Sequence, residues 1–351
     1  YAAKPYRAGT ENVIGSGTEI PPLATEAWVI DYYSGVLYLE NPTNDLITFV
    51  DAYLYIGDMA DQNSAASLEH ESVIVLDANR SDTYTEDGSS ERPYKTFASA
   101  WTALNTAEDT VFYFNPGTYT MNLTDAGAMA KKLSFIGQSK DSVILTPADI
   151  AVDCFKLTDK TGGLFFSNLT IQEAKYGIRV VNGTEVTLDT VRFSKCGSDG
   201  AVANHDGSKN QADQATAWNS NQLTNGGACR IENCTGAVTI KNCSVDYSLR
   251  GCRVQNCTGG GFIVNNEMLR TLESAVYLAS SSYDGLNGSI GFEIVNNNIA
   301  EAANNAILVI GGKDNVIKDN VIRKAWNSPI MLWHTLNTVI DSNRVIGSNV
   351  I

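Results

Sequence analysis

A duplicated octapeptide constrains the fold of this chain more than any other feature. Residues 229–236 (CRIENCTG) and 252–259 (CRVQNCTG) agree at six of eight positions and lie 23 residues apart. Fainter copies keep the period, because Asn298, Asn320 and Asn343 lead into short aliphatic runs at offsets of 22 and 23 residues. A fixed period of this length predicts a stack of equivalent units rather than a domain of unlike elements.

The repeated units have the composition of short β-strands. Segments 177–181 (GIRVV), 185–188 (EVTL) and 190–193 (TVRF) are rich in β-branched residues, and Gly, Asn and Asp separate them. No amphipathic helix of ten or more residues interrupts the region, although a parallel βαβ sheet needs such helices. The sequence therefore predicts an all-β fold, a right-handed single-stranded parallel β-helix with about 22–23 residues per coil.

The recurring asparagines have an expected structural role. An Asn that returns at one point of successive coils can pair its side-chain amide with the Asn above and below. Asn298, Asn320 and Asn343 are therefore expected to form a ladder.

The repeat also accounts for the cysteines. There are seven, and the C-x2-C spacing of zinc or haem sites is missing, so neither a metal nor a cofactor is expected. In the duplicated octapeptides the cysteines would stack one coil apart with parallel Cβ vectors, which do not converge to close a disulfide. We predict buried free thiols, and no disulfide in the pairs Cys229–Cys252 and Cys234–Cys257.

The repeat pattern predicts two parts of the chain. Residues 73–351 are expected to form the β-helix, and residues 1–72 a small strand-rich segment. A short amphipathic helix at about 94–105 would cover the open end of the first coil, which otherwise exposes a strand edge. The polar stretch at about 204–226 breaks the pattern and is expected to be an inserted loop. Because the pattern is still running at Ile351, the β-helix is expected to continue beyond it.

The charge and hydropathy of the chain exclude some partners. It carries 25 basic and 39 acidic residues, a net charge of −14. An acidic surface repels phosphate backbones, so nucleic acid is not an expected partner. No run of 18 apolar residues is present, so membrane insertion is not expected, and no signal peptide is visible.

The start of the β-helix region carries a family resemblance. DGSS at 87–90, PYKTF at 93–97 and PGTY at 116–119 resemble the opening coils of pectin-lyase-like β-helix proteins. The resemblance extends over roughly residues 73–351 and supports the fold. The polygalacturonase-type NTD and GHG signatures are absent, as is the calcium-binding Asp cluster of pectate lyases, so an enzymatic activity stays open.

The N-terminal segment carries a second resemblance. Residues 27–39 (AWVIDYYSGVLYL) and 49–57 (FVDAYLYIG) read as aromatic strands with a turn at 41–44 between them. This pattern resembles a strand-rich segment of bacteriophage tail and structural proteins. The resemblance implies that residues 1–72 attach the protein to other virion or tail proteins, and that it is a homotrimer.

Together these features predict a phage virion appendage, a tail spike or tail fibre subunit made in the host cytoplasm. Its β-helix would bind a host cell-surface polysaccharide. Two alternatives remain: a glycan depolymerase, either glycosidase or polysaccharide lyase, on the same scaffold, and a purely structural virion protein.

Two loops hold most of the candidate functional residues. The insert at 204–226 and a second loop at 280–288 could form a binding face, as loops on repeat scaffolds often do. A glycosidase needs two carboxylates about 5–9.5 Å apart, which neighbouring coils readily supply. The catalytic candidates are Asp206, Asp213, Asp284 and Glu293, and the loop candidates for sugar binding are His205, Trp218 and Tyr283. A solvated side loop is the alternative for the insert.

Arg230 and Arg253 are the remaining candidates for ligand binding. Strand alternation places both on the outer face, stacked one coil apart. Like charges at this spacing are unfavourable unless an anion or carboxylate lies between them. Contact with an acidic sugar and pairing with Glu232 and solvent are both open at this point.

Overall fold

The computed structural model describes residues 72–197, 226–281 and 288–347, and before them only five short strands. The chain divides into two compact units, Tyr1–Ala66 and Ser67–Ile351. In the first unit one strand pairs antiparallel with two others, and a further two strands form a separate antiparallel pair. The bounds are β1 (Lys4–Arg7), β2 (Thr18–Glu19), β3 (Trp28–Asp31), β4 (Val36–Leu39) and β5 (Phe49–Asp51), with β1 between β2 and β5, and β3 beside β4.

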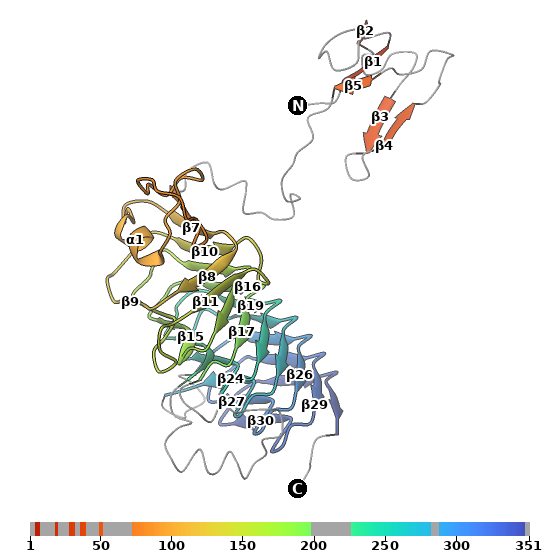
Figure 1. Ribbon diagram of the computed structural model, residues 1–351. Helices are drawn as coiled ribbons and strands as arrows, with labels where there is room; N and C mark the ends of the chain where they lie inside the picture. Colours follow the sequence, from red (N-terminus) through yellow and green to blue (C-terminus); the bar gives the residue numbers. More distant parts are fainter. Residues whose placement is uncertain are drawn as a thin grey trace. The chain divides into compact units, whose positions relative to one another are not determined.

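Three long parallel sheets make up the second unit, and from β7 onward every third strand along the chain joins the same sheet (Figure 1). Sheet 1 contains β6 (Ser72–Leu76), β7 (Thr110–Phe114), β10 (Leu133–Gly137), β13 (Leu164–Ser167), β16 (Val186–Asp189), β19 (Val238–Lys241), β22 (Gly261–Val264), β25 (Phe292–Val295), β28 (Val316–Lys318) and β31 (Val339–Asp341).

The other two sheets complete each coil. Sheet 2 contains β8 (Gly117–Thr120), β11 (Val143–Thr146), β14 (Thr170–Gln172), β17 (Arg192–Ser194), β20 (Ser244–Asp246), β23 (Glu267–Leu269), β26 (Asn298–Ala300), β29 (Val321–Arg323) and β32 (Arg344–Ile346). Sheet 3 contains β9 (Leu123–Asp125), β12 (Phe155–Thr158), β15 (Tyr176–Val181), β18 (Gly227–Glu232), β21 (Cys252–Gln255), β24 (Val276–Ala279), β27 (Ile307–Ile310) and β30 (Ile330–Trp333). The predicted right-handed parallel β-helix is confirmed.

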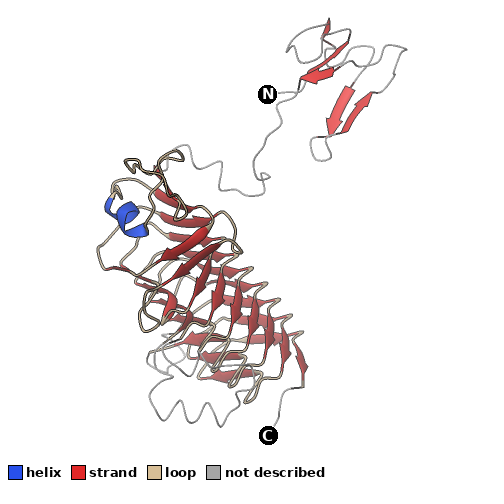
Figure 2. Ribbon diagram, viewed as in Figure 1, coloured by secondary structure: helices blue, strands red, loops and turns tan. Residues whose placement is uncertain are grey.

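The interior of the β-helix is filled by stacked apolar side chains. Near the first coils Phe135 stacks between Phe112 and Phe166, with ring centroids 5.4 and 4.8 Å apart. The helix α1 (Phe97–Thr102) begins at the N-cap Thr96, whose side chain accepts a hydrogen bond from the Ser99 amide. Phe97 is buried against Phe112, with ring centroids 5.3 Å apart, so the apolar side of α1 extends this aromatic stack. Among the described residues α1 is the only helix (Figure 2).

A ladder of asparagines, buried except for the half-buried Asn343, runs through the later coils. Asn266 donates to Asn297 at 2.9 Å, Asn297 to Asn320 at 2.9 Å, and Asn320 to Asn343 at 2.8 Å, all between side-chain amides. The ladder was expected, but the prediction that Asn298 belongs to it was wrong. Each of the last two steps spans 23 residues, and Asn298 instead opens β26 and pairs in register with Val321.

The Asn of the duplicated octapeptide forms a second, exposed ladder. Asn233 donates to Asn182 at 3.1 Å, and Asn256 donates to Asn233 at 3.2 Å. All three have a positive φ of 52–55°. Asn tolerates this left-handed conformation better than most residues with a side chain, and here it ends β15, β18 and β21 with a turn. The repeated Asn therefore provides both the left-handed backbone conformation of the turn and the hydrogen bond between coils.

All seven cysteines are buried, as predicted, and they are free thiols. Cys229 and Cys252 lie in register on neighbouring strands, and the Cys234 amide donates to the Cys257 sulfur at 3.4 Å. Burial raises the pKa of the Cys196 thiol to about 12, so the reactive thiolate is suppressed at neutral pH.

Because all seven thiols are buried, the folded chain is expected to resist alkylation, even though the contact with Cys257 lowers the pKa of Cys234. Iodoacetamide at pH 8 should leave all seven cysteines unmodified in the native protein and modify all seven after unfolding without a reductant. Mass spectrometry of the two digests distinguishes the states. Recovery of a bridged Cys229–Cys252 or Cys234–Cys257 peptide would contradict the prediction.

Candidate functional site

Three arginines form a straight file on the outer face of sheet 3. In β15, β18 and β21 the residues Ile178, Cys229 and Cys252 point into the core, in register with one another. The next residue of each strand points outward. These residues are Arg179, Arg230 and Arg253, here called the arginine file, and they pair in register from coil to coil. Neighbouring members lie on strands about 4.8 Å apart.

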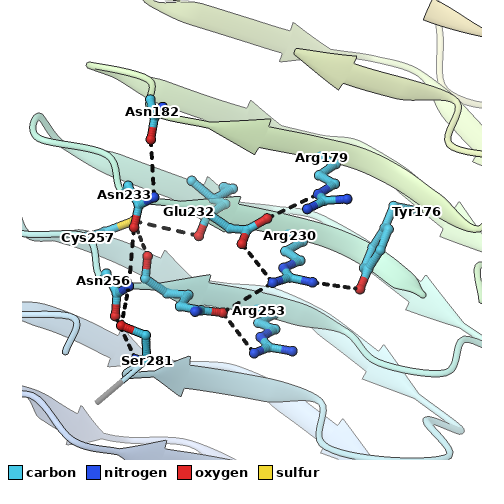
Figure 3. A network of polar contacts seen from close by, with 12 residues as sticks. Tyr176, Arg179, Asn182, Arg230, Glu232, Asn233, Arg253, Asn256, Cys257 and Ser281 are labelled. Carbon is cyan, nitrogen blue, oxygen red and sulfur yellow. Dashed lines mark hydrogen bonds and ion pairs between the residues drawn. The ribbon is translucent and has the colours of Figure 1, made fainter. Parts of the chain in front are cut away.

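The upper step of the file, between Arg179 and Arg230, holds a carboxylate. Glu232 lies two residues after Arg230 and therefore on the same face. Its Oε1 accepts from Arg179 Nε at 3.1 Å, and its Oε2 accepts from Arg230 Nη2 at 2.7 Å (Figure 3). The structure thus shows the pairing of Arg230 with Glu232, which was one of the two possibilities that the sequence left open.

The lower step, between Arg230 and Arg253, holds an amide instead. Gln255 pairs in register with Glu232, one coil further along. Its Oε1 accepts from Arg253 Nη2 at 2.8 Å and from Arg230 Nη2 at 3.4 Å. The Nε atoms of Arg230 and Arg253 are buried and have no hydrogen-bond partner among the described residues. Burial, together with the charges of Arg230 and Arg250, lowers the pKa of Arg253.

Two tyrosines flank the file. The ring of Tyr176 lies 5.8 Å from the Arg179 guanidinium carbon and 5.9 Å from that of Arg230, and its hydroxyl accepts from Arg230 Nη1 at 3.3 Å. Tyr277 follows Arg253 in register on β24, and its ring lies 5.0 Å from the Arg253 guanidinium carbon. Guanidinium groups over aromatic rings are held in place while their remaining donors stay available.

A buried ion pair supports the file from the preceding turn. Arg250 and Glu273 contact each other with side chains only 6% and 5% exposed. Burial raises the pKa of Glu273, and the nearby charges of Arg250 and Arg253 oppose that shift. We call this set the arginine face: Tyr176, Arg179, Arg230, Glu232, Arg250, Arg253, Gln255, Glu273 and Tyr277. Its four arginines and two glutamates leave two excess positive charges, on a chain whose net charge is −14.

The other candidates do not join this face within the described residues. Glu293 lies on β25 of sheet 1 and is exposed. The remaining candidates lie outside the described residues: His205, Asp206, Asp213, Trp218, Tyr283 and Asp284. Both gaps adjoin sheet 3 along the chain, because residues 198–225 precede β18 and residues 282–287 follow β24.

Sequence reasoning missed most of the arginine face. A usable signal existed, because segment 176–181 (YGIRVV) aligns with 227–232 (GACRIE) and places Arg179 above Arg230. The intervening insert hid this alignment, since it breaks the regular period. Gln255 was visible as the single polar difference from Glu232 between the two octapeptides.

The described residues contain neither a metal cluster nor a membrane helix. No group of three or more His, Cys, Asp or Glu side chains among them is placed to hold a metal ion. No helix in the same part of the chain is long and apolar enough to cross a bilayer.

Comparisons with known proteins find one family model and several solved structures that are similar to this chain. Residues 185–350, slightly under half of the chain, match the family model described as periplasmic copper-binding protein (NosD). A solved structure of Escherichia coli YbhC has a TM-score of 0.40 and 13% identity, covering 78% of this chain and 84% of that one. No curated protein sequence matches the chain.

Two further solved structures show the same similarity. A rhamnogalacturonan lyase has a TM-score of 0.32 and 12% identity, covering 80% of this chain and 63% of its own. ORF18 of Geobacillus virus E2 has a TM-score of 0.26 and 12% identity, covering 89% of this chain and 68% of its own. The protein is a parallel β-helix whose residues 185–350 are similar to the NosD family.

Proposed function

We propose that this protein is a phage virion appendage subunit, of the tail spike or tail fibre kind, whose β-helix binds a host cell-surface polysaccharide on the arginine face. Residues 1–72 would attach it to other tail proteins in the virion, as a homotrimer. The observation that carries the binding role is the arginine face, a local cationic and aromatic surface on an acidic chain.

The chemistry of the face suits a sugar polymer. Guanidinium groups present several donors in a fixed plane, which fits hydroxyl and carboxylate oxygens. Tyrosine rings offer apolar faces with a polar edge, which suits the faces of pyranose rings. Because the file repeats once per coil along a straight axis, it presents a regular row of donors to an extended chain.

The face supports binding better than hydrolysis. Acid–base cleavage of a glycosidic bond needs two available carboxyl groups. Both carboxylates of the arginine face are already engaged, Glu232 by Arg179 and Arg230, and Glu273 by Arg250. A depolymerase activity would therefore need carboxyl groups from elsewhere in the chain.

The test compares matched double variants of the full chain. Arg179→Ser with Arg253→Ser removes two arginines from sheet 3, and Arg192→Ser with Arg323→Ser removes two exposed arginines from sheet 2. Binding to a panel of extracted host surface polysaccharides is measured by biolayer interferometry at fixed ionic strength. The sheet 3 variant should bind at least about tenfold more weakly, a loss of about 1.4 kcal/mol.

The sheet 2 variant controls for net charge and should bind like the wild type. Equal affinity of both variants, or no binding of the wild type to any polysaccharide of the panel, would refute the proposal. Reducing ends and unsaturated products are followed in the same samples, because their appearance would favour the depolymerase alternative.

A further inference from the structure

The arginine file contains an internal comparison. Both steps pair neighbouring strands in the same register, and both lie between two stacked arginines. Glu232 accepts the hydrogen bonds in the upper step, and Gln255 accepts them in the lower step. Each side chain contacts the arginine of its own strand and that of the preceding coil: Glu232 at 2.7 and 3.1 Å, and Gln255 at 2.8 and 3.4 Å. The lower step is therefore the upper step with one negative charge removed.

Among the described residues no carboxylate forms an ion pair in the lower step, and Glu273, whose charge acts on Arg253, is already paired with Arg250. Arg253 takes part in no ion pair there, whereas Arg179 and Arg230 both pair with Glu232. Within the described ranges the Nε atoms of Arg230 and Arg253 have no hydrogen-bond partner. Like charges directly opposite each other on neighbouring strands are unfavourable. The charge imbalance is thus concentrated between Arg230 and Arg253.

We infer that the step between Arg230 and Arg253 is a subsite for the carboxylate of an acidic sugar, such as a hexuronate, which supplies the negative charge that Gln255 lacks. The inference rests on the proposed polysaccharide-binding function and names the chemical class of the ligand. Both arginines keep part of their side chains exposed, so the carboxylate approaches from solvent. Tyr277 follows Arg253 in register on the next strand, so the adjoining sugar would meet its ring.

A carboxylate fits this step better than a neutral sugar or a phosphate. The upper step already shows that two stacked arginines of this file hold one carboxylate, with one oxygen on each. A hydroxyl group would leave the excess charge in place. A phosphate carries about two charges at neutral pH, whereas the lower step lacks the single charge by which Gln255 differs from Glu232.

The decisive variant is Gln255→Glu, which supplies the carboxylate from the chain itself. It should raise the thermal midpoint of the protein and weaken binding of glucuronate at least about tenfold, because the subsite is then neutralised internally. Gln172→Glu on β14 of sheet 2 is the matched control, since it adds the same charge away from the arginine file. Arg253→Lys keeps the charge but loses the planar donors, and should also weaken glucuronate binding.

The probes are sodium glucuronate, glucose and inorganic phosphate, titrated at millimolar concentrations into the full chain and followed by ligand-observed NMR. Glucuronate binding that Gln255→Glu abolishes and Gln172→Glu retains supports the subsite. Equal binding of glucose and glucuronate, phosphate binding without glucuronate binding, or unchanged glucuronate binding by Gln255→Glu would overturn it.

If Gln255→Glu still binds the host polysaccharide like the wild type, the subsite is wrong while the proposed function stands. If glucuronate binds as expected but no host polysaccharide does, the proposed function is wrong while the subsite stands.

Discussion

Replacing Asn297 by Ala is expected to lower the free energy of unfolding by about 3–5 kcal/mol, because each buried polar group left unpaired costs about 1–3 kcal/mol. The Asn297 side chain donates to the carbonyl of Ile263 at 2.8 Å and to Asn320 at 2.9 Å. It also accepts from the backbone and side-chain amides of Asn266 at 3.0 and 2.9 Å. Alanine would leave these partners buried without a replacement.

The neighbouring residue provides the control. Asn298 has the same side chain but lies outside the buried ladder, where its amide is 3.5 Å from Glu267. Asn298→Ala should change the free energy of unfolding by no more than about 0.5 kcal/mol, as surface substitutions usually do. Urea unfolding followed by circular dichroism measures both. Equal destabilisation by the two variants would show that the ladder does not stabilise this β-helix.

This pair of asparagines also shows how far the sequence carries a prediction of the fold. The octapeptide repeat is sufficient to predict the β-helix, because near-identical residues one coil apart must occupy equivalent positions. The register of the later coils is harder, since both Asn297 and Asn298 lie close to one period before Asn320. Which of them points inward depends on strand alternation within the coil, and a shift of one residue exchanges the two faces.

The arginine face shows a second reason why sites are harder to predict than folds. Arg230 and Arg253 were visible because they lie within the duplicated octapeptide. Arg179 belongs to the same file but lies 51 residues before Arg230, because an insert separates the two coils. The supporting groups lie outside the duplicated octapeptide: Tyr176 opens β15, and Arg250 lies in the turn before β21.

Replacing Glu232 by Gln is expected to cost about 2 kcal/mol of stability, less than the 3–5 kcal/mol for breaking a fully buried ion pair. The expected loss is smaller because the side chains of Arg179 and Arg230 are 27% and 16% exposed, so solvent screens part of the attraction that is lost. The variant converts the upper step of the file into a copy of the lower step, with an amide between two arginines. Thermal unfolding at low ionic strength measures the loss, and added salt should reduce the difference from wild type.

The same substitution makes a prediction about binding. If Gln255 makes the lower step a carboxylate subsite, then Glu232→Gln should create a second one and increase the number of glucuronate molecules bound per chain. The exchange variant, Glu232→Gln with Gln255→Glu, keeps the composition and net charge of the chain and moves the uncompensated step up by one coil. It should bind one glucuronate between Arg179 and Arg230 and regain most of the stability that Glu232→Gln loses. A stoichiometry that stays at the wild-type value in Glu232→Gln, measured by titration with glucuronate, would show that the charge between stacked arginines does not determine where the carboxylate binds.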